Sequence, residues 1–354
     1  MKFLENDLFI IAEAGVNHNG SHKLAHEMID LAKQANADAV KFQTFDPDKV
    51  CIKDAPKAKY QSKNVKSKSQ IEMLKELELS KDTFKDLSTH AQDIGIEFIS
   101  TAFDKDSLDF LIDEIDMKTI KIPSGEIDNY DFLDHIASKS MPTIISTGAS
   151  NINEIIAAYN LINHNDLIND EEKTFEKLIQ RNFIPNEKIA ILHCISEYPA
   201  ILSEANINCI KTLADKFKCA VGYSDHCEGI SASLSAVSVG ATIIEKHFTK
   251  DKDLPGPDHK ASITTEELKN MISILKEIKI SLGDEQKKIV DCELENQKII
   301  RRSVVALKKI KKGEKFSKEN ITCKRPATGL SASKFFEIIG NKSDQDYQVD
   351  EFIK

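Results

Sequence analysis

The sequence predicts a (β/α)8 barrel, known as a TIM barrel, followed by a small α+β module. Two features predict the barrel. Eight short runs rich in β-branched residues alternate with amphipathic helix patterns, and each run stops at a polar residue. A third feature predicts the module, because after residue 300 the alternation ends and a strand-like VVAL, a KKGE turn and short helix signals follow.

The eight expected strands are apolar runs bounded by turn or helix signals. Between them lie patterns such as KLAHEMIDLAKQA and EELKNMISILKEIKISLG, in which apolar residues recur with the period of a helix. This repeated alternation favours a closed parallel barrel over an open sheet. The strands are expected at residues 8–12, 39–41, 97–100, 119–122, 143–146, 190–193, 220–222 and 241–245.

The polar residues that end these runs are candidates for an active site. In a (β/α)8 barrel the carboxyl ends of all strands meet at one rim, and that rim carries the catalytic groups. We therefore expect these side chains to surround one site. They are Glu13, Lys41 with Gln43, Ser100 with Thr101, Lys121 with Ser124, Ser146 with Thr147, His193, Ser224 with Asp225 and His226, and Glu245 with His247.

The expected domains are a catalytic barrel over residues 1–283, a polar linker over 284–300 and the small module over 301–354. Residues 51–70 interrupt the barrel pattern with six lysines and one aspartate. This segment is either a solvated loop or a basic lid over an anionic ligand.

Composition and charge exclude several classes of protein. The 354 residues carry a net charge of −9, which disfavours a nucleic-acid partner because phosphate contacts need clustered lysine and arginine. The N-terminus lacks the pattern of a secretory signal, and no run approaches the ~18 apolar residues of a membrane helix. Seven scattered cysteines without a CxxC pair indicate reduced thiols. We therefore expect a cytoplasmic protein with no membrane partner.

Two histidines are candidate metal ligands. His226 and His247 follow the seventh and eighth expected strands, which are neighbours in a barrel. Two imidazoles at these ends could share one metal and leave positions open for substrate. Histidines at such positions can also be ordinary core or surface residues, and spacing alone does not decide between the two.

Glu13 and a set of cationic and hydroxyl side chains are the other candidates. The Glu13 carboxylate could be a general base or a third metal ligand, or it could cap the next helix or pair with a lysine. Two lysines and three hydroxyls suit a phosphate and a carboxylate, although they could equally be solvated or cap helices. Without a GxGxxG or P-loop motif, nothing indicates a nucleotide. The set comprises Lys41, Thr101, Lys121, Ser124 and Ser146.

Ordered motifs point to a known family. The segments IAEAGVNHNG, VKFQTF, FISTAFD, IKIPSGEI, ISTGAS, ILHCISEYPA, VGYSDH, EKHFT and GPDHKAS occur in this order. Together they closely resemble the sialic acid synthase family. The C-terminal KKGEKFSKENITCKRPATGLSA resembles the antifreeze-like (SAF) domain of that family, so the resemblance covers essentially the whole chain.

The resemblance implies roles for individual residues. A divalent metal, manganese in the first place with magnesium or cobalt as alternatives, would be held by His226 and His247, and Glu13 would be the catalytic carboxylate. In the family an arginine of the SAF domain reaches the partner subunit's site; Arg325 matches it, which implies a homodimer. The phosphoenolpyruvate contacts would be Lys41, Thr101, Lys121, Ser124, Ser146, Ser196 and Ser224, and the sugar contacts Gln43, Glu126, Tyr198, Asp258 and Arg325 of the partner subunit.

Three positions depart from the family pattern. Ala102 stands in place of a proline and Ala149 in place of a methionine, while Ser196 matches an asparagine that contacts phosphoenolpyruvate. None of these changes removes a charged group, so the implied activity stands. Only the contact expected of Ser196 is placed in doubt.

The implied activity is the condensation of phosphoenolpyruvate with an N-acetylated amino-sugar to make a nonulosonic acid, with phosphate released by C–O cleavage. The expected sugar is N-acetylmannosamine, which gives N-acetylneuraminate. The alternative is 2,4-diacetamido-2,4,6-trideoxymannose, which gives N,N'-diacetyllegionaminate. The appended module and GPDHKAS argue against a 3-deoxy-octulosonate- or heptulosonate-type synthase. Polar residues at all strand ends argue against a non-catalytic carbohydrate-binding scaffold.

Overall fold

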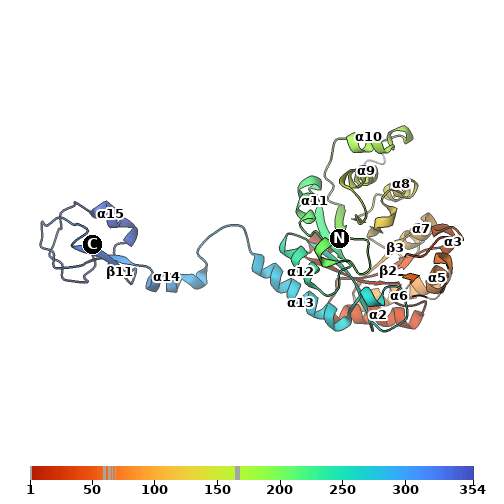
Figure 1. Cartoon of the computed structure of the whole chain (residues 1–354), viewed down its shortest axis with the longest axis horizontal. Coiled ribbons are helices and arrows are strands. Elements are labelled where there is room, and N and C mark those ends of the chain that lie inside the picture. Colours follow the sequence, from red (N-terminus) through yellow and green to blue (C-terminus); the bar gives the residue numbers. More distant parts are fainter. Residues whose placement is uncertain (1, 59–60, 63–64, 66, 68, 164–167) are drawn as a thin grey trace. The chain divides into compact units, whose positions relative to one another are not determined.

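The computed structural model describes residues 2–58, 61–62, 65, 67, 69–163 and 168–354, which divide into two compact units, Met1–Gly283 and Asp284–Lys354. The first unit is built on parallel strands surrounded by helices (Figure 1). Its strands are β1 Phe9–Gly15, β2 Ala39–Thr44, β3 Glu97–Ala102, β4 Ile120–Ile122, β5 Thr143–Ser146, β6 Ile189–Cys194, β7 Ala220–Asp225, β8 Ile243–Thr249 and the short β9 Ile263–Thr264.

The strands form a nearly closed barrel. Hydrogen-bonded neighbours follow the order β3-β2-β1-β8-β7-β6-β5-β4, so strands consecutive in sequence are adjacent and β8 returns beside β1. β3 and β4 lie next to each other, although among the described residues no ladder joins them. This arrangement confirms the predicted (β/α)8 barrel, with eight strands at the eight expected places.

Several strands extend further than their apolar runs predict. The runs of the first and eighth strands end at residues 12 and 245, whereas backbone pairing continues to Gly15 and Thr249. A polar side chain does not end a strand whose backbone groups stay paired, and successive side chains point to opposite faces. The polar rim residues are therefore held within the rigid sheet.

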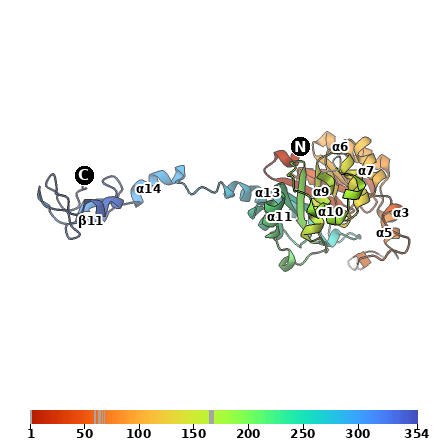
Figure 2. The same cartoon turned by 90° about the horizontal axis from the view of Figure 1, so that it is seen from above.

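The helices cover the outside of the barrel, as Figure 2 also shows. α6 illustrates the local logic: the Ser80 hydroxyl accepts the backbone N–H of Thr83 at 3.1 Å, and Phe84 and Leu87 face the core. The helix ends at Gly95, whose φ of 76° is readily adopted only by glycine. The helices are α1 Lys2–Glu5, α2 His22–Gln34, α3 Pro47–Val50, α5 Gln70–Leu77, α6 Lys81–Ile94, α7 Lys105–Asp113, α8 Tyr130–Ser138, α9 Ile152–Asn163, α10 Phe175–Gln180, α11 Cys209–Phe217, α12 Ser231–Ser238 and α13 Thr265–Leu282, with a 3-10 turn, η1, at Ser124–Glu126.

The second unit is a small α+β fold with its own core. β10 Ser303–Ala306 pairs antiparallel with β11 Ile321–Lys324, and α15 Phe335–Ile338 packs nearby. Residues 284–300, the expected linker, contain the helix α14 Leu294–Ile300. The buried core consists of Val304, Ala306, Ile310, Phe316, Ile321, Tyr347 and Ile353.

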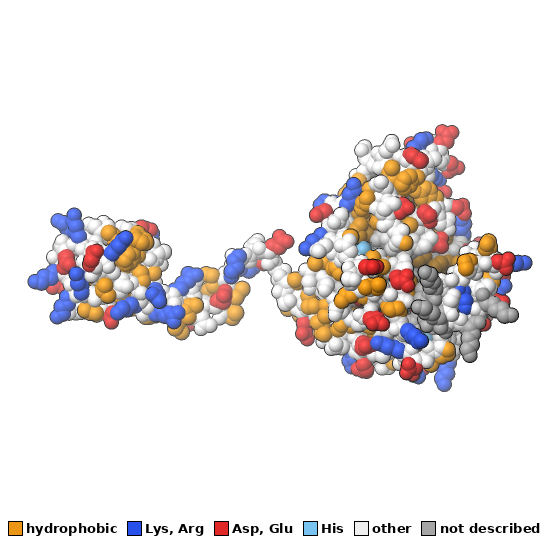
Figure 3. Space-filling model, viewed as in Figure 1, with side chains coloured by type: hydrophobic (Ala, Val, Ile, Leu, Met, Phe, Trp, Pro, Cys, Tyr) orange, Lys and Arg blue, Asp and Glu red, His pale blue; other side chains and the backbone are white. Residues whose placement is uncertain are grey.

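The surface of the described residues carries charged side chains of both signs, in agreement with the composition. Acidic and basic side chains are interspersed on the visible face of the first unit (Figure 3). Within the described ranges, every helix is too short or too polar to cross a bilayer.

Candidate active site

A pocket of about 260 Å³ opens at the carboxyl-terminal rim of the barrel. It collects most of the residues that the sequence proposes. Glu126 is not among its lining residues, although Ser124 and Gly125 beside it are, and Arg325 belongs to the second unit. The predicted residues that line it are Glu13, Lys41, Gln43, Thr101, Lys121, Ser124, Ser146, Ser196, Tyr198, Ser224, His226, Glu245, His247 and Asp258.

Strand register brings the central groups together. Glu13 on β1 is paired with Lys41 on β2 and with His247 on β8. Ser224 on β7 is paired in the same way with Glu245 on β8. Paired residues on neighbouring parallel strands face the same side of a sheet, so these five side chains converge inside the rim.

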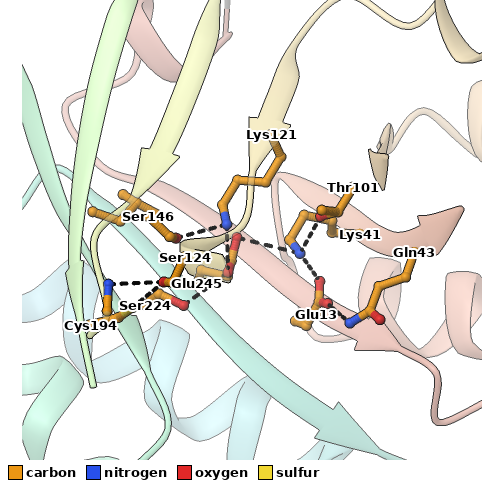
Figure 4. A network of polar contacts seen from close by, with 12 residues as sticks. Glu13, Lys41, Gln43, Thr101, Lys121, Ser124, Ser146, Cys194, Ser224 and Glu245 are labelled. Atoms are coloured by element: carbon orange, nitrogen blue, oxygen red, sulfur yellow. Dashed lines mark hydrogen bonds and ion pairs between the residues drawn. The ribbon is translucent and has the colours of Figure 1, made fainter. Parts of the chain in front are cut away.

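Lys41 lies between two buried carboxylates (Figure 4). Its Nζ is 2.6 Å from Oε2 of Glu13 and 3.7 Å from Oε2 of Glu245, and it donates to Oγ1 of Thr101 at 3.1 Å. All four side chains are almost fully buried. Buried charges are expensive to desolvate, so a cluster of them at a barrel rim indicates function rather than stability.

A second lysine, Lys121, contacts the other oxygen of the Glu245 carboxylate. Lys121 Nζ is 3.4 Å from Oε1 of Glu245 and donates to Oγ of Ser146 at 2.8 Å. Ser224 Oγ also donates to Oε1 of Glu245 at 2.9 Å. Glu245 therefore holds both lysines and one serine in fixed positions (Figure 4).

The two carboxylates differ in proton affinity because their neighbours differ. Burial raises the pKa of Glu13 to about 7, against the opposing attraction of Lys41. Burial also acts to raise the pKa of Glu245, but Lys121 and Lys41 outweigh it and lower the pKa to about 2. Glu245 thus stays ionised, whereas Glu13 can exchange a proton near neutral pH, which suits a general acid or base.

A cradle of small polar groups lies next to the lysines. A Cβ on Gly148 would lie 2.1 Å from Oγ of Ser196 and 2.9 Å from Oγ of Ser124, so only glycine fits there. The backbone N–H of Gly148 donates to Oγ of Ser124 at 2.9 Å, and Cys194 Sγ is 3.1 Å from the same oxygen. Hydroxyl groups beside two lysines form a site suited to an anion.

His226 and His247 fit the requirements of metal ligands. The Ile195 carbonyl can only accept, so Nδ1 of His226, 2.6 Å away, carries a proton. Nε2, which lies 3.4 Å from Oγ of Ser224, is then unprotonated and able to ligate. His247 Nδ1 is buried and has no hydrogen-bond partner among the described residues. Burial lowers the pKa of His226 to about 4 and the pKa of His247 well below its usual value, so both rings are neutral, as metal binding requires. Their ring centroids are 5.5 Å apart.

A buried ion pair behind the site fixes these two histidines. Lys246 Nζ is 3.1 Å from Oδ2 of Asp225, and both side chains are fully buried. Asp225 Oδ1 accepts the backbone N–H of Cys227 at 2.9 Å. Because Asp225 and Cys227 flank His226 and Lys246 precedes His247, this pair locks the ends of β7 and β8 together.

Of the residues expected to contact a sugar, Gln43, Tyr198 and Asp258 line the pocket. The Tyr198 ring lies 4.2 Å from the His226 ring, and Gln43 Nε2 donates to Glu13 Oε1 at 3.4 Å. Burial raises the pKa of Asp258 to about 6. Glu126, on η1, instead accepts from Nδ2 of Asn129 at 2.6 Å.

The motifs NHNG and GPDHKAS hold each other in place. His259 contacts Oγ1 of Thr249 at 2.7 Å and Oδ1 of Asn19 at 3.1 Å. Asn17 Nδ2 donates to the Phe248 carbonyl at 2.9 Å. These buried contacts join the loops after β1 and β8, and so position Asp258 in the pocket.

The pocket has an apolar wall that the sequence analysis missed. It is assembled from residues far apart in the chain, and no single segment indicates it. Of residues 51–70, Gln61 and Gln70 line the pocket, whereas 59–60, 63–64, 66 and 68 lie outside the described residues, so the lid hypothesis remains untested. The wall consists of Val16, Phe45, Val50, Met73, Leu74, Leu77 and Phe103.

Cys194 is a further lining residue that the sequence analysis did not propose. Glu245 was expected at the rim as a polar strand end, but the sequence analysis gave it no chemical role. Its spacing of two from His247 on one strand places both side chains on the same face, and this periodicity could have identified it.

The fold, together with the family match and the relatives given below, defines a phosphoenolpyruvate-dependent condensing enzyme of the nonulosonic acid synthase class. The NeuB family model matches residues 28–287 and the SAF domain model matches residues 301–354. The chain therefore belongs to the NeuB family.

Individual relatives show which synthases of this family the chain is similar to. The chain is 44% identical to the N,N'-diacetyllegionaminic acid synthase of Campylobacter jejuni over 98% of both chains. It is 45% identical to the enzyme of the same name from Legionella pneumophila, over 94% of this chain and 90% of that one. Among solved structures, the N-acetylneuraminic acid synthetase of Leptospira borgpetersenii matches with a TM-score of 0.67 and 33% identity, over 82% of this chain and 90% of that one.

Proposed function

We propose that this enzyme condenses phosphoenolpyruvate with 2,4-diacetamido-2,4,6-trideoxymannose to make N,N'-diacetyllegionaminate. The reaction class is carried by one observation: Lys41 and Lys121 converge on Glu245 beside two neutral histidines at the barrel rim. The choice of sugar is supported by the higher identity to the two legionaminic acid synthases than to the sialic acid synthetase. N-acetylmannosamine, which the sequence analysis placed first, is therefore the less well supported substrate.

Phosphoenolpyruvate is proposed to bind where the lysines and the cradle meet. Lys121 and Ser146, already 2.8 Å apart, offer a cation and a hydroxyl to the same anionic group. Lys41 and Thr101 offer a second such pair at 3.1 Å. Because Glu245 fixes both lysines before substrate arrives, little reorganisation is needed on binding.

A divalent metal, manganese in the first place, is proposed to be held by His226 and His247. Two protein ligands leave coordination positions open to substrate and water. When bound, the metal would supply Lewis-acid polarisation of the sugar's aldehyde oxygen. The neutral state of both rings supports this assignment.

Glu13 is proposed to move the proton of the attacking water. C3 of phosphoenolpyruvate bonds to the aldehyde carbon as the C2–C3 double bond opens. The carbonyl electron pair passes to the aldehyde oxygen, which takes up a proton and becomes a hydroxyl group. Positive charge develops at C2, and water adds there. Glu13, whose pKa of about 7 lets it accept a proton at neutral pH, takes the proton from that water. The resulting tetrahedral carbon releases phosphate with cleavage of the C–O bond.

The apolar wall gives a physical reason for the preferred sugar. The diacetamido sugar carries two acetyl methyl groups and a methyl group at C6, whereas N-acetylmannosamine carries hydroxyl groups at C4 and C6. Phe45, Met73 and Phe103 offer an apolar surface to these methyl groups. A hydroxyl group of N-acetylmannosamine placed against the same surface would lack a hydrogen-bond partner.

We further propose a homodimer in which Arg325 completes the sugar site of the partner subunit. Arg325 is exposed, and its Nε donates to the carbonyl of Ile300 at 2.9 Å, which leaves its two terminal nitrogens as donors for a ligand.

We also propose a cytoplasmic location. The free state of all seven cysteines supports a reducing compartment.

The substrate is tested by measuring phosphate release from phosphoenolpyruvate with each sugar separately. We expect kcat/KM with the diacetamido sugar to exceed that with N-acetylmannosamine. The reverse order would assign the enzyme to N-acetylneuraminate synthesis, and release only with arabinose 5-phosphate would place it in a different class.

A further inference from the structure

A cluster of histidines and aspartates lies outside the barrel, where α2 and α6 pack side by side (Figure 1). His22 and His26 are four residues apart on α2, in the segment HKLAH. Asp86 and His90 are four residues apart on α6, in DLSTH. Residues four apart on a helix share a face, so both pairs project from the surface along which the two helices meet.

Two imidazoles in this cluster point at one carboxylate oxygen. Nε2 of His22 is 2.7 Å and Nε2 of His26 is 3.0 Å from Oδ2 of Asp86. The His90 ring packs against the His26 ring at an interplanar angle of 35°, with centroids 4.0 Å apart, and Nε2 of His90 is 2.8 Å from Oδ1 of Asp30. The neighbouring His90 ring limits how far His26 can rotate away from Asp86.

We propose that His22, His26 and Asp86 form a binding site for a divalent transition metal of the zinc class, with water completing the coordination. Their ligand atoms all lie within 4.8 Å of one another. A tetrahedral zinc with bonds of ~2.0–2.1 Å needs ligand atoms ~3.3 Å apart. The two histidine–aspartate separations, 2.7 and 3.0 Å, reach that value by a small outward rotation of the side chains, and the two imidazole nitrogens lie within 4.8 Å of each other.

The donor set selects the metal. Two imidazoles and one carboxylate suit zinc, cobalt, nickel or copper, whereas magnesium and calcium prefer oxygen ligands and manganese binds such sites more weakly. Lys23 follows His22, where helical HExxH metalloproteases carry their general base, so this site lacks that catalytic group. The bound metal would cross-link α2 to α6 and stabilise the folded barrel.

The ordinary alternative is a set of solvated ion pairs. The side chains of His22 and Asp86 are 53% and 52% exposed, and pairs at such exposure contribute little stability. A pair with a single imidazole exists on the same barrel: Nε2 of His135 is 2.8 Å from Oδ1 of Asp109, which Lys139 Nζ also contacts at 2.6 Å. His135 can be replaced as a control. The convergence of two imidazoles on one oxygen separates the proposed site from this control.

The test counts zinc bound to the full-length protein after chelation and equilibrium dialysis at modest zinc excess. The starting protein is His226→Gln/His247→Gln, in which the proposed active-site metal cannot bind, so the result is independent of the proposed function. We expect it to retain one zinc per chain and to unfold at a higher temperature with zinc than without. Adding His22→Ala and His26→Ala should remove both effects, whereas adding His135→Ala should leave both unchanged.

Two results would overturn the proposal. One is a starting protein that binds no zinc. The other is zinc that stays bound after His22 and His26 are both replaced, which would place the ion elsewhere. Replacement of these two residues by alanine favours the helix and removes only exposed or half-exposed rings, so the fold should survive the test.

Discussion

Replacing Glu13 by glutamine should lower turnover strongly and, at the same time, stabilise the metal-free protein at alkaline pH. Glutamine has the shape of the carboxyl group without its charge. The buried Glu13 carboxylate is costly to ionise, since its pKa of about 7 in the folded protein exceeds the ordinary value of 4.5. The glutamine side chain carries no charge at any pH, so the variant does not have this cost of ionisation.

The size and direction of the effect follow from this difference. The folded protein holds the Glu13 proton more tightly than the unfolded chain, so wild-type stability falls as the pH rises from 4.5 to 7 and levels off above. The difference between 7 and 4.5, at 1.36 kcal/mol per pKa unit, corresponds to about 3 kcal/mol. Glu13→Gln should therefore differ little from wild type below pH 4.5 and be more stable by up to about 3 kcal/mol at pH 8.

The assay is urea unfolding of both proteins at pH 5 and pH 8 in the presence of a chelator, so that no divalent cation offsets the carboxylate charge. Glu228→Gln, a change at an exposed carboxylate, serves as the control variant. In metal-supplemented assays, Glu13→Gln should lower kcat strongly and leave the KM for phosphoenolpyruvate nearly unchanged. The reasoning fails if the variant is less stable at both pH values, or if its gain is the same at pH 5 and pH 8.

Four further outcomes are expected. A chelator should abolish phosphate release and Mn²⁺ should restore it, and full activity after thorough chelation would contradict the metal assignment. The variants His226→Gln and His247→Gln should each lose most turnover with an unchanged circular dichroism spectrum. Phosphoenolpyruvate with ¹⁸O in the bridging position should send its label into phosphate, as mass spectrometry would detect, and label retained in the sugar acid would mean P–O cleavage. Phe103→Ser should lower kcat/KM for the diacetamido sugar more than for N-acetylmannosamine, and an equal loss would deny the apolar wall a role in selection. Mixing Glu13→Ala with Arg325→Ala should restore roughly a quarter of wild-type activity if the arginine serves the partner subunit, because a mixed dimer then has one intact site; no recovery would mean that it serves its own barrel.

Local sequence was sufficient to predict the strands and much of the rim, because an apolar run before a polar residue reflects how a barrel strand is buried. It could not predict where strands end, since backbone pairing at β8 continues through His247 to Thr249. The apolar wall could not be predicted from local sequence for a different reason. Val16, Phe45 and Phe103 follow three different strands and meet only in the folded barrel.

Motif spacing also did not separate functional residues from those that support them. Asn17, Asn19 and His259 occur in the motifs that carry the family resemblance, yet their hydrogen bonds join two loops. Asp225 and His226 are neighbours in sequence, but only His226 lines the pocket, because the side chains alternate and Asp225 faces the buried Lys246. Assigning such roles required the direction of each side chain.

The charge balance of the site links the binding of the anion to the binding of the metal. Above pH 7, Glu13 and Glu245 neutralise Lys41 and Lys121, so these four side chains offer an incoming anion no net positive charge. A phosphate and a carboxylate would have to share lysines that are already paired, and the desolvated site penalises any excess of negative charge. The histidines are neutral and add nothing. On the proposed mechanism, the two positive charges of a divalent cation at His226 and His247 would offset the excess negative charge that phosphoenolpyruvate brings to the site. Affinity for phosphoenolpyruvate should therefore depend on the metal, even though the lysines and hydroxyls supply the direct contacts.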